Sequence, residues 1–236
     1  MKNIGNVEKV SVKKVSVILP CLNEEKGIGI CIKKIKQVFN ENLIDGEIIV
    51  VDNGSSDKTF EIAKSFNVKV VYEPRKGYGR AYLTGFKEAH GDVVIMGDGD
   101  NSYDFYEIPR FLNELENFNI DFVIGNRKVI MKNASPFLHR SIGRPFFSFL
   151  LKLLFNIKIS DSHCGFGAIK KEPLNKLNLK SDGMEFASEI LIKAKKQNLK
   201  IKEIPIVYYK RIGKSKLRTF RDGTRHLKLI LKEKFN

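Results

Sequence analysis

The stretch DVVIMGDGD, residues 92–100, joins a short apolar run to two aspartates, Asp98 and Asp100. An apolar run such as residues 92–96 is typical of a strand that is buried inside a sheet. In extended backbone, residues i and i+2 project to the same side, so the two carboxylates converge and Gly99 leaves space between them. Oxygen ligands of this kind suit Mg²⁺ or Mn²⁺, which also bind substrate phosphates. We therefore expect a divalent metal site at the end of this strand, and the structural alternative is a polar turn.

The apolar run at residues 92–96 is the last of four in the first 100 residues, and helical patterns separate the four. We expect the strands at residues 15–19, 47–51, 68–72 and 92–96, and the helices at 24–38, 57–66 and 81–89. Strands that alternate with helices, each strand a continuous apolar run, predict an α/β fold with a mostly parallel, Rossmann-like sheet that helices cover on both faces. In such sheets ligands bind beyond the carboxyl ends of the strands.

The second half of the chain is less regular. We expect strands at residues 122–125 and 204–209 and helices at 183–197 and 217–235. Residues 145–157 (PFFSFLLKLLFNI) form an apolar stretch that is too short to span a bilayer, because a spanning helix needs roughly 20 residues.

Two more polar clusters follow strand ends, and a third polar segment lies in a loop. Residues 20–25 (PCLNEE) and 52–57 (DNGSSD) suit helix starts and turns, and the carboxylate of Asp52 and amide of Asn53 can also accept hydrogen bonds from a nucleobase. Residues 75–81 (RKGYGRA) form a basic, glycine-bearing loop before a helix, where backbone amides and cations can hold a diphosphate. No dinucleotide-binding or P-loop pattern is present in the sequence.

The length of 236 residues and a hydrophobic fraction of 42% predict one folded α/β domain with a C-terminal extension. Three scattered cysteines are too few for a disulfide framework or a zinc site, which favours a reducing compartment. The first 14 residues contain no long apolar segment, so we expect no secretory signal.

The net charge of +15 is concentrated in two segments. Residues 122–160 contain seven Lys or Arg and no Asp or Glu, and residues 210–236 contain ten Lys or Arg and two acids. The rest of the chain is balanced. Localised blocks of this kind predict an anionic partner, which from charge alone is a nucleic acid, an anionic lipid or a phosphorylated substrate. The structural alternative is a solvated basic face.

Each basic segment also contains an apolar helix pattern. In the C-terminal one, apolar residues follow helical spacing beside a basic stripe: Leu217, Phe220, Leu227, Leu231 and Phe235 beside Arg218, Arg221, Arg225, Lys228 and Lys232. An apolar face flanked by cations is typical of a helix that lies in the interface of an anionic membrane. We therefore expect peripheral membrane binding, while residues 146–155 have ordinary core packing as an alternative.

Four ordered motifs, P-x-x-N-E, V-D-N-G-S-S-D, K-G-x-G-x-A and D-G-D, resemble those of the family 2 glycosyltransferases with the GT-A fold. Residues 125–127 (GNR), 161–166 (DSHCGF), 183–189 (GMEFASE) and 211–216 (RIGKSK) are similar to the dolichyl-phosphate mannose and glucose synthases. The resemblance covers residues 16–231. It divides the chain into an N-terminal extension (1–14), a GT-A domain (15–210) and a basic, membrane-interfacial segment (211–236).

The resemblance implies an inverting transfer of a sugar from a UDP- or GDP-linked donor to dolichyl or polyprenyl phosphate. It places the enzyme in the cytoplasm, peripherally on the cytoplasmic face of a membrane, with Mg²⁺ or Mn²⁺ as cofactor. An ionised lipid phosphate needs no general base, but its charge must be screened by cations. The sugar, the base and the oligomeric state are left open.

The resemblance also implies roles for individual residues. It assigns nucleotide binding to Pro20, Leu22, Glu24, Asp52, Asn53, Lys76 and Asp98, and metal binding to Asp98 and Asp100. It assigns catalysis to Asp100, Arg127, Arg211 and Lys216, and contact with the acceptor phosphate to Arg127, Lys214, Ser215 and Lys216. Three residues depart from the family pattern, since Asn53 replaces an Asp, Ser102 a metal-binding Gln and Gly167 an Arg.

Two other functions fit parts of the sequence. An enzyme of the same fold that acts on a hydroxyl of a soluble glycan or polysaccharide needs a base, for which Glu185 and Glu189 are the candidates. A non-enzymatic nucleic-acid-binding protein would explain the charge but not the Asp98 and Asp100 pair. We therefore expect no nucleic acid partner.

Overall fold

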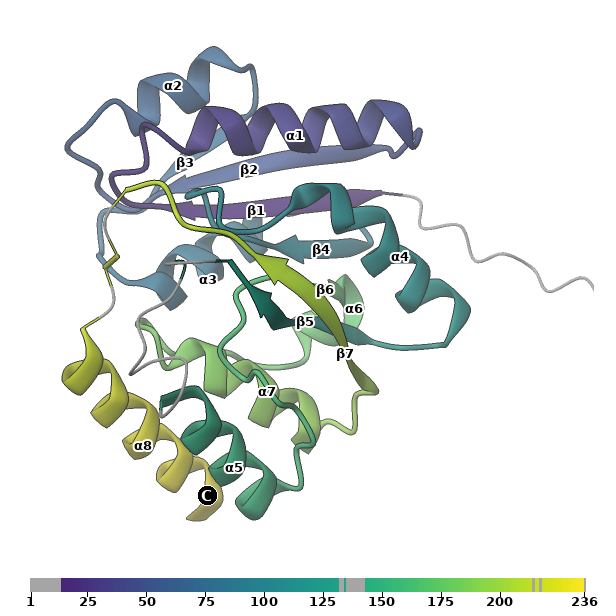
Figure 1. Ribbon diagram of the computed structural model, residues 1–236, viewed down its shortest axis with the longest axis vertical. Coiled ribbons are helices and arrows are strands. Elements are labelled where there is room, and N and C mark those ends of the chain that lie inside the picture. Colours follow the sequence, from purple (N-terminus) through teal and green to yellow (C-terminus); the bar gives the residue numbers. More distant parts are fainter. Residues whose placement is uncertain (1–13, 132–133, 135–142, 214, 217, 236) are drawn as a thin grey trace, which may run out of the picture.

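The computed structural model describes residues 14–131, 134, 143–213, 215–216 and 218–235, which form a seven-stranded sheet with helices on both sides (Figure 1). The strand order is β3-β2-β1-β4-β6-β5-β7. The strands are β1 (Val15–Cys21), β2 (Gly46–Asp52), β3 (Lys69–Tyr72), β4 (Val93–Met96), β5 (Phe122–Ile130), β6 (Gly167–Lys170) and β7 (Ile201–Tyr208). The helices are α1 (Ile28–Glu41), α2 (Thr59–Ser65), α3 (Tyr78–Glu88), the 3₁₀ turn η1 (Phe105–Glu107), α4 (Ile108–Asn117), α5 (Arg144–Phe155), α6 (Lys171–Asn175), α7 (Phe186–Lys196) and α8 (Thr219–Phe235).

The four strands expected in the first 100 residues form the parallel half of the sheet. β1 pairs in parallel with β2 on one side and β4 on the other, and β2 pairs with β3. Ile49, Val50 and Val51 are fully buried, as a strand covered on both faces requires. The predicted α/β fold with a mostly parallel sheet is confirmed, and the carboxyl ends of β1, β2 and β4 meet at one edge.

The second half adds elements that the sequence patterns did not predict. β6 runs antiparallel to both β4 and β5, so it is the one strand that breaks the parallel arrangement among the described residues. It has only four residues, too few to show a periodicity. The helices α4 and α6 were also missed, and β5 extends five residues beyond the expected strand at 122–125.

Helix α3 lies tightly against the strands that carry the polar clusters. A Cβ added at Gly85 would lie 2.5 Å from Ile18 Cγ2, so only glycine allows this approach. The Tyr82 ring of α3 stacks on Phe186 of α7 with centroids 5.2 Å apart. Figure 1 shows α7, α5 and α8 continuing as a layer below α3. The first and last thirds of the chain therefore share one core.

The C-terminal helix α8 turns its apolar stripe outward. Phe220 is 87% exposed and Phe235 is 83% exposed, whereas Asp222, His226, Ile230 and Glu233 are buried against the body of the protein. Leu217, which the sequence analysis placed in the same stripe, lies outside the described residues. Within the part of the chain that the structure describes, no helix is both long and apolar enough to cross a membrane.

Candidate active site

A cavity of about 560 Å³ lies at the sheet edge where β1, β2 and β4 end. It gathers most of the residues that the sequence analysis selected: Pro20, Leu22, Glu24, Asn53, Lys76, Asp98, Asp100, Arg127, Arg211, Ser215 and Lys216. Asp52 is buried and does not line the cavity, because its carboxylate faces Ser55 N at 3.3–3.4 Å. Lys214 lies outside the described residues.

Asp98 and Asp100 follow β4 and both line the cavity. Asp98 accepts a hydrogen bond from Tyr78 Oη at 3.1 Å, and Asp100 accepts one from Ser102 N at 2.9 Å. Burial raises the pKa of Asp98 to about 7, and the nearby charge of Asp100 adds to the rise. Burial and mutual repulsion both favour a positive charge beside these two carboxylates.

The donor set fits a divalent cation that is shared with a ligand. The described residues contain no group of three or more His, Cys, Asp or Glu arranged to hold a metal by themselves. Two carboxylates alone suit Mg²⁺ or Mn²⁺, because these ions commonly complete their shell with water and substrate phosphate. The buried Glu24 Oε2 near this pair has no hydrogen-bond partner among the residues that the structure describes. Asp98 and Asp100 would be the residues that hold the ion.

Arg211 and Lys216 reach the carboxylates from the segment that links β7 to α8. Arg211 Nη2 lies 3.0 Å from Asp100 Oδ2 and 3.1 Å from Glu24 Oε1, and Lys216 Nζ lies 3.2 Å from Glu24 Oε1. The backbone of this segment is also anchored, since Ile212 N donates to Asp100 O at 2.9 Å. Two of the predicted catalytic cations are thus within reach of anything that binds between Asp100 and Glu24.

The side-chain amide of Asn53 binds the backbone at and before the basic loop 75–81. It is therefore not available to form hydrogen bonds with a nucleobase. Its Nδ2 donates to Glu73 O at 3.0 Å and Arg75 O at 2.8 Å, and its Oδ1 accepts from Gly77 N at 2.7 Å. A carboxylate could not donate to the two carbonyls. This explains in physical terms why Asn suits a position where the family pattern has Asp.

A second group of cations surrounds Asp161. Arg127, which follows the buried part of β5, makes a two-point contact with Asp161 at 2.7 Å for each bond, and Arg144 Nη1 of α5 lies 3.1 Å from the same carboxylate. Burial alone would raise the pKa of Asp161, but the two arginines lower it to about 2. The pair of arginines carries one more charge than Asp161 neutralises. Arg144 was missed, although the charge count of residues 122–160 included it.

The two acids considered as bases have structural partners. Glu189 accepts hydrogen bonds from Lys180 N and Ser181 N, and Glu185 Oε1 is 2.6 Å from Arg225 Nη2. Both are buried. Ser102 is also fully buried and does not line the cavity, and Gly167 lies in β6, where an added Cβ would lie 2.9 Å from Val123 O. Glu185 Oε2 has no hydrogen-bond partner among the described residues, but neither Glu185 nor Glu189 lines the cavity.

Two histidines that the sequence analysis did not select connect the site to α8. His163 Nε2 lies 3.2 Å from His226 Nδ1, which is 2.8 Å from Ser188 Oγ. Burial lowers the pKa of both imidazoles, that of His226 to about 4. The two residues are 63 positions apart in the chain, so no local spacing could have paired them.

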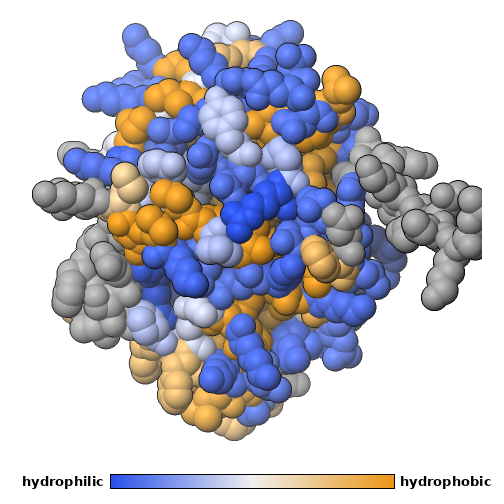
Figure 2. Space-filling view, turned by 45° about the vertical axis from the view of Figure 1, so that its right-hand side comes forward, coloured by the Kyte–Doolittle hydropathy of each residue, from blue (hydrophilic) through white to orange (hydrophobic). Residues whose placement is uncertain are grey.

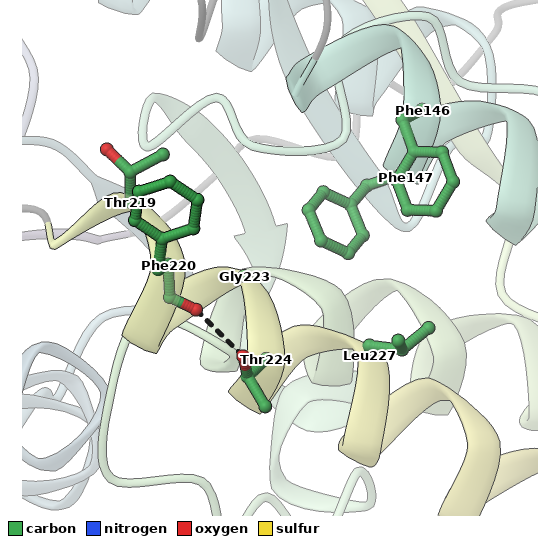
Figure 3. A pocket seen from close by; sticks show the side chains of 7 residues that line it. All are labelled: Phe146, Phe147, Thr219, Phe220, Gly223, Thr224 and Leu227. Atoms are coloured by element: carbon green, nitrogen blue, oxygen red, sulfur yellow. Dashed lines mark hydrogen bonds between the residues drawn. The ribbon is translucent and has the colours of Figure 1, made fainter.

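An apolar groove of about 270 Å³ lies between α5 and α8. Figure 3 shows Phe146 and Phe147 on α5 facing Phe220, Gly223 and Leu227 on α8. Phe147, Thr219 and Gly223 line both this groove and the larger cavity, so the two spaces share a wall. The larger cavity therefore opens towards apolar surface on the side of α8.

The family model for glycosyl transferase family 2 matches residues 16–177. The chain is a family 2 glycosyltransferase. Among curated relatives of this glycosyltransferase, the low-salt glycan biosynthesis hexosyltransferase Agl6 of Haloferax volcanii is 38% identical over 92% of the chain. The match covers 53% of Agl6, so the chain spans about half the length of that relative.

Two further relatives of the glycosyltransferase match over most of both chains. A dolichyl-phosphate hexose transferase of Haloferax volcanii is 30% identical over 92% of each chain. A UDP-N-acetylglucosamine–dolichyl-phosphate N-acetylglucosaminyltransferase of Methanococcus voltae is 31% identical over 82% of this chain and 85% of its own.

Among solved structures, glucosyl-3-phosphoglycerate synthase from Mycobacterium tuberculosis, in complex with Mn²⁺, UDP and phosphoglyceric acid, superposes with a TM-score of 0.75. It is 22% identical, and the match covers 94% of this chain and 78% of that one. At this identity the likeness shows the GT-A fold.

Proposed function

We propose that this glycosyltransferase moves a sugar, with inversion, from a UDP- or GDP-linked donor to dolichyl or polyprenyl phosphate at a membrane surface. The single observation that carries the proposal is the shared wall between the polar cavity and the apolar groove. A lipid phosphate has one charged end and one apolar chain, and this pair of spaces matches both. Two of the relatives bear the name of dolichyl-phosphate transferases.

On the donor side, the residues of the chain bind and orient a nucleotide diphosphate. Pro20 and Leu22 flank the base, and Lys76 with the backbone of the 75–79 loop faces the diphosphate. A divalent ion held by Asp98 and Asp100 would neutralise charge on the departing diphosphate. Arg211 and Lys216 add cations to the same place, which stabilises the leaving group.

On the acceptor side, Arg127 and Arg144 attract and orient the phosphate. They lie close together around Asp161 and retain a net positive charge, so they can screen an incoming phosphate monoester. A phosphate oxygen is already ionised near pH 7, so the reaction needs no base. The engagement of Glu185 and Glu189 in structural contacts supports this acceptor over a glycan hydroxyl.

We also propose that α5 and α8 seat the enzyme on the cytoplasmic face of an anionic membrane. Phe149, Leu153, Leu231 and Phe235 on these helices are exposed, and basic residues flank them. Figure 2 shows apolar side chains at the lower end of the molecule, where Figure 1 draws α5 and α8. Each Lys or Arg near anionic lipid contributes about 1 kcal/mol to such binding.

A screen of donors tests this proposal. UDP- and GDP-linked sugars are each incubated with a polyprenyl phosphate in vesicles, with MgCl₂, with MnCl₂ or with EDTA, and lipid-linked sugar is measured. We expect product with one nucleotide and a divalent ion, and none in EDTA. Product that forms equally well in EDTA would contradict the metal assignment, and no product with any donor would contradict the proposed reaction.

A further inference from the structure

The glycine-bearing loop at residues 75–79 is held from two sides. On one side Asn53 makes three hydrogen bonds to it and to the strand end before it. On the other side lies the segment 181–183, whose carbonyls approach so closely that a Cβ at Gly77 or Gly79 would overlap with them. Arg80 N donates to Asp182 O at 3.0 Å and Gly79 N to Gly183 O at 3.3 Å. The position of the loop therefore depends on where residues 181–183 lie.

The segment 181–183 is in turn fixed by the start of α7. Ser181 N donates to Glu189 Oε2 at 2.8 Å, and Gly183 N donates to Glu185 Oε1 at 3.2 Å. Both carboxylates are buried, so these bonds are shielded from water. Glu185 is the member of this pair that also has a charged partner.

That partner is Arg225, which comes from the C-terminal helix α8. Arg225 Nη2 donates to Glu185 Oε1 at 2.6 Å. The guanidinium also lies against the backbone of the segment, because a Cβ at Gly183 would be 2.6 Å from Arg225 Cζ. The Glu185 side chain is 9% exposed and that of Arg225 is 36% exposed, and Arg225 is the member of the ion pair that lines the cavity.

We propose that Arg225 is a positioning residue through which the C-terminal helix holds the donor-binding loop. The contacts run from Arg225 through Glu185 and Gly183 to Gly79 and Gly77, and then to Asn53 at the end of β2. Arg225 acts on the donor through this path and not by touching the diphosphate. The inference rests on the proposed assignment of the 75–79 loop to the donor.

The expected effect is on donor affinity. A loop that holds the diphosphate equally in the ground state and the transition state contributes uniform binding, so its loss raises the donor KM and leaves kcat nearly unchanged. One charge-assisted hydrogen bond at a partly exposed site corresponds to about a tenfold change in affinity. The KM for the acceptor should not change.

The experiment measures binding of UDP and of GDP in the presence of MnCl₂ by titration calorimetry, for four proteins besides the wild type. Arg225→Ala removes the cation, and Glu185→Gln removes the charge pairing but keeps an oxygen for Gly183 N. The double variant Arg225→Ala/Glu185→Gln tests whether the two act as one unit. Lys228→Ala is the matched control, since Lys228 is an exposed cation on the same helix that does not line the cavity.

We expect the dissociation constant to rise about tenfold in each single variant, with no further rise in the double variant and no change in the control. Thermal unfolding checks that each protein is folded. If Arg225→Ala fails to fold, Gly183→Ala tests the same contact. The added methyl group displaces the flexible guanidinium of Arg225, while the charges of Arg225 and Glu185 are both kept. Its affinity should fall by a similar factor.

Three results would overturn the inference. If Arg225→Ala or Gly183→Ala binds the nucleotide as tightly as the wild type, Arg225 does not position the loop. If Arg225→Ala weakens binding and Glu185→Gln does not, Arg225 contacts the diphosphate directly. If the folded wild type binds neither UDP nor GDP with Mn²⁺, the proposed donor site itself is wrong, and this inference is overturned with it.

Discussion

Acidification tests how α8 is held against the body of the protein, because His226 lies on the inner face of this helix. His226 is 3% exposed and contacts Ser188 Oγ and His163 Nε2, with the charges of Asp222 and Arg225 nearby. Burial lowers its pKa from 6.5 to about 4. The unfolded chain therefore binds a proton at this position more readily than the folded protein does.

The sign and size of the effect follow from that difference. A histidine with a lowered pKa in the folded state leaves stability intact above about pH 6.5 and reduces it as the pH falls towards 4. At about 1.4 kcal/mol per pKa unit, the full loss corresponds to roughly 3 kcal/mol of unfolding free energy. The pKa of His163 is lowered as well, which adds a loss in the same direction.

The assay is denaturant unfolding of the wild type and of His226→Gln at pH 7.5 and pH 4.5. Carboxylates also titrate in this range, so the quantity of interest is the difference between the two proteins. We expect the variant to be less stable than the wild type at pH 7.5 but to lose roughly 2–3 kcal/mol less on acidification. His90→Gln is the control, because His90 is an exposed histidine far from α8 in the chain. Equal acid losses in His226→Gln and the wild type would refute the reasoning.

The remaining predictions concern the site and the surface. Asp100→Ala should lower transfer on the order of a thousandfold while the unfolding midpoint is retained, and Asp98→Ala should lower it nearly as much, because the diphosphate loses its metal bridge. Activity of Asp100→Ala at the wild-type rate in EDTA would contradict this. Changing Arg218, Arg221 and Lys228 to Glu should weaken co-sedimentation with anionic vesicles and transfer to long-chain acceptors. Wild-type vesicle binding by this triple variant at low salt would count against the interfacial role of α8.

The parts of the fold that the sequence predicted are those with local signals. The runs at 15–19, 47–51 and 92–96 each bury a strand, and parallel strands end at one edge, so Asn53 and the Asp98–Asp100 pair could be placed together before the structure was known. The resemblance added Arg211 and Lys216, which come from a segment more than a hundred residues away. The structure places both within 3.2 Å of predicted site residues.

What the sequence could not predict depends on long-range contacts. β6 has four residues and takes its antiparallel direction from its two neighbours in the sheet. Glu185 was a candidate base for a hydroxyl acceptor, but its carboxylate pairs with Arg225, 40 residues further along the chain. Asp52 was assigned to the nucleobase of the donor. In the structure its carboxylate accepts a hydrogen bond from Ser55 N in the local turn, and Asn53 lines the cavity instead. In each case the partner, and not the residue type, decides the role.

The central claim is that the acceptor is an anionic lipid phosphate, and a matched pair of acceptors tests it most directly. Polyprenyl phosphate and the corresponding polyprenol, with the same chain, are presented in the same vesicles with the active nucleotide sugar and divalent ion. The account predicts lipid-linked sugar with the phosphate and none with the alcohol, because Arg127 and Arg144 bind the phosphate and neither candidate base, Glu185 or Glu189, lines the cavity where a hydroxyl would be activated. Equal or faster transfer to the alcohol would contradict it.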